Sequence, residues 1–198
     1  GCVCYAISCT EPGASNTPRG ATNWVKNELR DLGVYGKDAL TKFIPDSYKF
    51  DSWENRLHLL AGLIDTDGHY KDANCGFEYM TSSKQLAEDV RWLARSLGFH
   101  ASMAEKIINS QHVQGHLGYR VQIFGDLEQI PTRLPRKQAR SRISSKNPLR
   151  YGIKSVESVG KGQFYGFNVS DNHLYLDENF FVHHNCIIKQ VVEDAVNS

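Results

Sequence analysis

LAGLIDTDG, residues 60–68, is the stretch that decides the interpretation of this sequence. It closes a segment from about Ser52 to Asp65 whose apolar residues recur at helical spacing, so we predict an amphipathic helix there. Gly62 in the middle of this helix costs about 1 kcal/mol relative to alanine. Together with Ala61 it leaves little side-chain bulk, which predicts a closely docked neighbour such as another helix.

Two carboxylates, Asp65 and Asp67, fall at the C-terminal end of this helix, where the helix dipole is negative. A bound cation would reverse that unfavourable charge, and magnesium is commonly held by a carboxylate, waters and substrate phosphates. These residues therefore indicate a Mg²⁺ site acting on a phosphate ester. On the residue types alone, a simple turn at Asp67-Gly68 is an equally good interpretation.

The residues around this helix predict an α+β unit. The order helix, strand pair, helix, strand pair, helix gives an antiparallel sheet with one free face. Further helices are expected at residues 23–32 and from Ser82 or Ser83 to Leu97, and strands at 76–81, 99–108 and 119–124.

The chain has 198 residues, of which 40% are hydrophobic and 23% charged, and its net charge is +1. These values are typical of a globular protein with its own core, and they give no global sign of a nucleic-acid partner. We find no apolar run of membrane-spanning length and no secretory signal. The five cysteines are not spaced as zinc ligands, so we expect reduced thiols, no membrane partner and an intracellular protein of the nucleus or cytoplasm.

Charge is nevertheless segregated along the chain. Residues 131–150 contain many lysines and arginines and no acid, whereas acids outnumber bases after residue 151. We place a domain boundary at residues 145–150. The basic stretch predicts contacts to DNA phosphates, which give affinity but no sequence choice. A solvated helix and linker is the alternative.

A second reactive cluster, His183-His184-Asn185-Cys186, follows strand-like alternation in residues 165–182, which predicts a buried β segment. An asparagine amide can attack its own backbone carbonyl and cut the following peptide bond if a neighbouring imidazole protonates the leaving amine. Cys186 would then be a thiol nucleophile for acyl transfer. From these four residues alone, a surface or metal-binding tail remains an alternative.

The nonamer resembles the motif of the LAGLIDADG homing endonucleases and differs from it only at Thr66. The resemblance is strongest to the second motif repeat of the vacuolar ATPase type of intein. It implies an αββαββα half-unit with a saddle-shaped antiparallel sheet, motif helices packed in pairs, and Asp67 as the metal ligand. It also implies two catalytic lysines, Lys42 in LTKFIPDSY and Lys137 in LPRKQAR.

Such a protein would bind double-stranded DNA with the polar face of its sheet. Strands can enter the major groove, and polar side chains that alternate on them are candidates to contact bases. The candidate phosphate contacts are Arg133, Arg136 and Arg140, and the candidate base contacts are Lys71, Glu78, Tyr79, Arg120 and Gln122.

Residues 165–186 resemble the C-terminal splicing blocks of inteins, which form part of an all-β splicing (Hint) domain. The resemblance implies His173 as the assisting histidine, His184 as the penultimate histidine, Asn185 as the cyclising residue and Cys186 as the first host residue. Gly166 stands where many inteins have aspartate, a difference that the vacuolar ATPase type shares. The expected organisation is an endonuclease domain at 1–145, a splicing segment at 146–185 and the start of the C-extein at 186–198.

The N-terminal splicing blocks and a first endonuclease motif are not found in the sequence. We therefore expect as partners the missing N-terminal half, or a second copy of the chain, and the host extein. Three alternatives stay open: a DNA-binding remnant whose nuclease has decayed, a single-motif homodimeric endonuclease, and an inert remnant.

Overall fold

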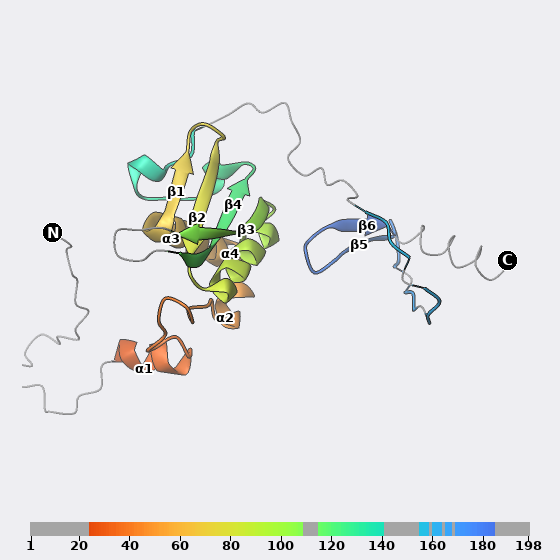
Figure 1. Cartoon of the computed structure of the whole chain (residues 1–198), viewed down its shortest axis with the longest axis horizontal. Helices are drawn as coiled ribbons and strands as arrows, with labels where there is room; N and C mark the ends of the chain where they lie inside the picture. The colour runs from red at the N-terminus through yellow and green to blue at the C-terminus, as the bar shows by residue number, and fades with distance from the viewer. Residues whose placement is uncertain are drawn as a thin grey trace, which may run out of the picture.

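A four-stranded antiparallel sheet with helices on one face forms the main unit, and a separate two-stranded hairpin follows it (Figure 1). The computed structural model describes residues 24–108, 115–140 and 155–184, apart from 159, 164 and 168. This arrangement confirms the α+β class. No helix in the described ranges is long and apolar enough to cross a membrane.

The two long helices begin at the serines that the sequence indicates. In α3 (Trp53–Asp67) the Ser52 hydroxyl accepts a hydrogen bond from a backbone amide of the first turn, at 3.2 Å. In α4 (Lys84–Ser96) Ser83 makes the same kind of cap at 3.1 Å. The shorter helices are α1 (Trp24–Asp31) and α2 (Asp46–Lys49).

The sheet has the strand order β1-β2-β4-β3, with every neighbouring pair antiparallel. Its core face packs on α3 and α4, and Leu60, Phe77, Val90 and Ile123 are fully buried there. The other face carries polar side chains, as we expected of a sheet with one free face. The strands are β1 (Gly68–Lys71), β2 (Gly76–Thr81), β3 (His100–Ile108) and β4 (His116–Phe124).

The expected last helix is absent from the described residues after β4. Two short 3-10 turns stand in its place, η1 (Leu127–Gln129) and η2 (Pro135–Lys137). Pro131 and Pro135 lack an amide donor and disfavour helical backbone at the residue before them, so they break the chain into turns. The αββαββα expectation therefore fails at its final element, as far as residue 140.

Two further expectations need correction. A side chain built at Gly62 would meet nothing within 4 Å, so no neighbour among the described residues docks there. The hairpin of β5 (Leu174–Leu176) and β6 (Val182–His184) is not buried. Val182 is 64% exposed and Leu176 60%, because a two-stranded hairpin has no second layer of its own to cover it.

Candidate functional site

The two aspartates at the end of α3 have different surroundings. Asp65 is engaged in the fold, because its carboxylate accepts hydrogen bonds from the backbone amides of Arg133 at 2.7 Å and Leu134 at 3.2 Å. These bonds attach the segment after β4 to the end of the helix. Asp67, in contrast, is exposed, and none of the described residues forms a hydrogen bond or ion pair with its carboxylate.

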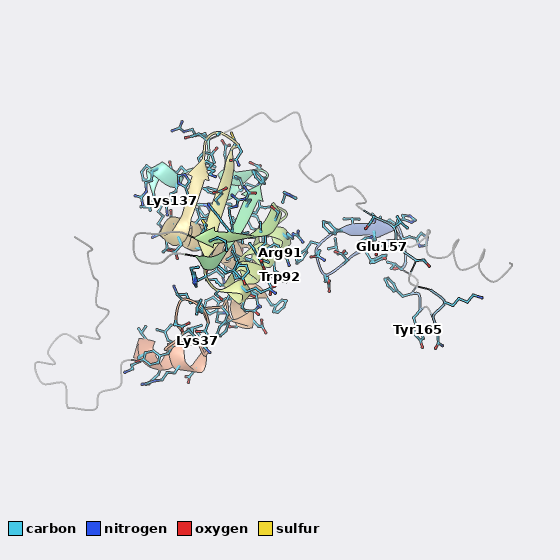
Figure 2. The ribbon with its side chains drawn as sticks, viewed as in Figure 1. Lys37, Arg91, Trp92, Lys137, Glu157 and Tyr165 are labelled. Carbon is cyan, nitrogen blue, oxygen red and sulfur yellow. The ribbon has the colours of Figure 1, made fainter. Side chains whose placement is uncertain are left out.

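Lys137 is buried at the end of α3, and Figure 2 labels it beside the start of β1. Its ammonium donates to the backbone carbonyls of Ile64 at 2.9 Å, Asp65 at 2.8 Å and Thr66 at 3.1 Å. An ammonium has three N–H donors, and all three are used here. The structure therefore contradicts a direct catalytic contact from Lys137 and gives it a capping role.

This contact also answers the charge argument made from the sequence. The negative end of the α3 dipole faces a cation, but the cation is the Lys137 ammonium, which complements the last carbonyls of the helix. The carboxylate of Asp67, one residue beyond those carbonyls, stays free to bind something else.

Gly68 explains how Asp67 is held. A Cβ at Gly68 would lie 2.7 Å from Cα of Ile64, so only glycine lets β1 start directly after the helix. Asp67 is thus the last helical residue and Gly68 the first strand residue, which replaces the alternative of a simple turn. The carboxylate is carried by two rigid elements rather than by a loop.

Asp67 lines a groove of about 430 Å³ whose walls are mostly apolar. Lys37 and Lys42 line the same groove, and both are exposed. The structure thus brings Lys42 and Asp67 to one site, as the resemblance implied. Tyr79 forms part of the inner wall, and burial, followed by the charge of Asp67, raises the pKa of its phenol to about 12.

As a metal site this arrangement is partial. The described residues hold no group of three or more histidines, cysteines or acids that could surround an ion. Asp67 supplies one exposed carboxylate, which suits Mg²⁺ when water and phosphate oxygens fill the other positions. The donors present therefore fit one half of a shared site.

The polar face of the sheet is organised around Glu78. Its carboxylate lies 2.8 Å from the Lys71 ammonium and 3.7 Å from the Arg120 guanidinium, and it accepts a hydrogen bond from the Gln122 amide at 3.0 Å. Burial alone would raise the pKa of Glu78, but the hydrogen bonds and charges of these neighbours together lower it. Three expected base contacts thus share one face and one anchor.

Tyr79 was wrongly expected among the base contacts. Strand alternation puts it on the core face, where it is 1% exposed, so it cannot contact DNA. Arg133, Arg136 and Arg140 are exposed, and Arg140 lies 3.4 Å from the Asp72 carboxylate. Their contacts to phosphates stay a prediction.

The hairpin brings two of the expected splicing residues together. The rings of His173 and His184 have centroids 5.8 Å apart. His173 has a φ of +59°, and its Nδ1 is buried without a hydrogen-bond partner among the described residues. Asn185 and Cys186 lie outside the described residues, so their geometry is not given.

Sequence reasoning missed the role of Asp177. Its carboxylate lies 3.1 Å from Nε2 of His183 and also accepts the amides of Asn179 at 2.8 Å and Phe181 at 2.9 Å. Burial opposes the shift, but these partners lower the pKa of Asp177. An aspartate two residues before an asparagine in a turn is the signal that would have indicated this loop.

Residues 43–149 match the family model described as homing endonuclease, and the chain belongs to this family. Its members are hydrolases that bind and cut double-stranded DNA and generally use divalent metal ions. The α3 end and the polar sheet described above both lie within the matched residues.

Three curated proteins are similar to parts of the chain. An iron-sulfur cluster assembly SufBD family protein of Mycobacterium leprae is 28% identical over 67% of this chain and 17% of its own length. A replicative DNA helicase DnaB of Mycobacterium intracellulare is 34% identical over 46% and 15%. The catalytic subunit of a V-type proton ATPase from Candida tropicalis is 26% identical over 88% and 17%. The chain spans about a sixth of the length of these relatives.

Proposed function

We propose that the chain is the C-terminal portion of an intein, in which a DNA endonuclease unit precedes a C-terminal splicing segment. The observation that carries this proposal is the set of relatives. Their names describe iron-sulfur cluster assembly, DNA unwinding and proton transport, yet each matches this chain over only 15–17% of its length. A segment common to proteins named for such different activities is expected of an inserted element.

The nuclease part would use Asp67 to hold a divalent ion, with Mg²⁺ as our proposal. When bound there, the ion would polarise a phosphate oxygen and lower the pKa of a bound water. Lys42, which shares the groove with Asp67, would offset the negative charge that develops on the phosphoryl oxygens. Asp65 and Lys137 would act only by fixing the end of α3.

A complete nuclease site needs a second carboxylate, and the exposed surface at Gly62 is where a second motif helix would pack. We propose that the missing N-terminal half of the protein supplies this helix. A second copy of the chain is the alternative. Analytical ultracentrifugation distinguishes them, because the first predicts a monomer and the second a dimer.

DNA would lie on the polar face of the sheet. The cluster of Lys71, Arg120 and Gln122 around Glu78 would contact base edges, and the exposed arginines after β4 would contact phosphates.

The splicing part would cleave the peptide bond after Asn185, with His173 and His184 assisting. The structure supports this proposal through the proximity of the two imidazoles on one hairpin. The exposed apolar side chains of that hairpin, Leu176 and Val182, also indicate that another part of a splicing domain covers them.

Mass spectrometry of the purified chain at neutral pH tests the splicing proposal. The proposal predicts slow release of the peptide Cys186–Ser198, and Asn185→Ala should abolish the release. An intact mass after prolonged incubation, in the presence of the N-terminal half, would contradict it and favour an inert remnant.

Cleavage of randomised duplex DNA in Mg²⁺, with the N-terminal half present, tests the nuclease proposal. Asp67→Asn should abolish cleavage and leave binding in place, whereas Asp72→Asn, at another exposed aspartate, should retain both. Salt-sensitive binding without any cleavage by the unaltered protein would favour the decayed nuclease.

A further inference from the structure

We propose that helix α4 is the platform that orients the splicing hairpin, with Trp92 and Arg95 as positioning residues for cleavage after Asn185. This inference rests on the splicing function proposed above and adds a role for the endonuclease unit in it. The contact joins α4 to the loop 177–181 between β5 and β6.

Trp92 lies on the side of α4 toward the hairpin (Figure 2). Its ring meets the ring of Phe180 edge-on, with centroids 5.2 Å apart, and on its other side it meets Phe50, also at 5.2 Å. Edge-to-face pairs at this distance are favourable. Trp92 is therefore held by its own unit while it receives an aromatic side chain of the hairpin loop.

Arg95 makes the polar part of the contact. Its Nη1 donates to the side-chain oxygen of Asn179 at 2.9 Å, and its guanidinium lies 5.5 Å from the centre of the Phe181 ring. The same guanidinium donates from Nε to the carbonyl of Ala101 at 2.9 Å. Arg95 is thus fixed to β3 before it reaches the loop, so it can define a position rather than follow one.

The loop is rigid enough to pass that position on. Asp177 accepts the amides of Asn179 and Phe181 and also lies 3.1 Å from His183 in β6. Phe180 has a φ of +63°, a backbone conformation that residues other than glycine rarely adopt. Such a residue persists where its surroundings hold it, and here it points its ring at Trp92.

Strand β6 runs from this loop to His184, the residue directly before Asn185. An orientation set at Phe180 is therefore carried over a few residues of strand to the reacting peptide bond. Clefts of about 340 and 500 Å³ flank the contact, so a small number of side chains bears it. Single substitutions should then be enough to disturb it.

The test measures release of the peptide Cys186–Ser198 from the intact chain with its N-terminal half. Trp92→Ala and Phe180→Ala should each slow release about tenfold, because small misplacements of reacting groups are costly. The double variant should be no slower than either single variant, since both remove one contact. Trp92→Phe should keep most of the rate, and Lys84→Ala, in the first turn of the same helix, should leave it unchanged.

Hydrogen exchange provides a readout that does not depend on cleavage. Trp92→Ala should speed exchange of the amides of residues 174–184 and leave those of β2 unchanged. If β2 also exchanges faster, the variant has loosened the whole unit, and Asn179→Ala, on the loop side, then decides the matter.

The outcomes separate the two proposals. If the unaltered protein releases no peptide and Trp92→Ala still speeds hairpin exchange, the splicing function fails while the docking contact stands. Equal release rates in the unaltered protein, Trp92→Ala and Asn179→Ala overturn the positioning role. Unchanged hairpin exchange in both variants overturns the docking contact itself.

Discussion

The Lys137 ammonium lies 2.8 Å from the backbone carbonyl of Asp65, while the Asp65 carboxylate binds the amide of Arg133 four residues earlier than the lysine. The end of α3 and the segment after β4 thus hold each other from both directions. The contact fixes the last turn of the helix and, through it, the place of Asp67. It also separates a residue that supports the site from the carboxylate that is free to bind an ion.

Lys137→Met should lower the free energy of unfolding by about 3 kcal/mol, because three carbonyls at a buried helix end lose their donor. Lys84→Met, at an exposed lysine 3.9 Å from Glu88, should change it by less than about 0.5 kcal/mol. Urea denaturation of both variants checks the difference. Near-native stability in Lys137→Met, with loss of DNA cleavage, would restore the direct catalytic role.

Tyr79 should titrate late among the nine tyrosines, because the pKa of its phenol is raised from 10.0 to about 12 by burial and then by the charge of Asp67. The unfolded chain loses this proton first, so the stability it contributes is complete below pH 10.0 and is lost as pH rises toward about 12. Absorbance titration at alkaline pH should show one late phenol. It should vanish in Tyr79→Phe and move to lower pH in Asp67→Asn; an unchanged late phenol in Tyr79→Phe contradicts the assignment.

Glu78→Gln should strengthen binding to random-sequence duplex DNA, because the change frees the charges of Lys71 and Arg120 from a carboxylate on the same face. Each added phosphate contact steepens the dependence of log affinity on log salt by about 0.9. Fluorescence anisotropy across a salt series measures both effects. Glu128→Gln, at an exposed glutamate in η1, is the matched control. Weaker binding by Glu78→Gln would mean that DNA does not lie on this face.

Gly62→Ala should stabilise the isolated chain by about 0.5–1 kcal/mol, because alanine is the better helix former and the added methyl group meets open space. The same methyl group should hinder a second motif helix. Denaturation at two protein concentrations separates the alternatives. Destabilisation that grows with protein concentration would show that a second copy already covers α3.

Much of the fold could be predicted because its signals are local. The apolar spacing and the serines before α3 and α4 fixed both helices to within about two residues, and β2 was placed at its observed bounds. The last helix failed because the apolar spacing after β4 was weighed without Pro131 and Pro135. The short β1 has too few residues for alternation to reveal it.

The site was less accessible to sequence reasoning. A basic residue type indicates charge but not depth, so Lys137 was interpreted as a catalytic amine although it is buried. Tyr79 failed for a related reason, since one step along a strand exchanges the two faces of a sheet. Asp67 and Lys42 were found through the motif, and their common groove depends on how residues 37–45 fold over α3.

Paramagnetic broadening by Mn²⁺ tests most directly whether Asp67 is the metal ligand, because it detects weak binding to the chain itself. Sub-stoichiometric Mn²⁺ should broaden the amide signals of residues 66–69 before all others. Asp67→Asn should remove this effect, and Asp72→Asn should leave it in place. Broadening that persists in Asp67→Asn, or that centres on other carboxylates, would contradict the division between a structural Asp65 and a metal-binding Asp67.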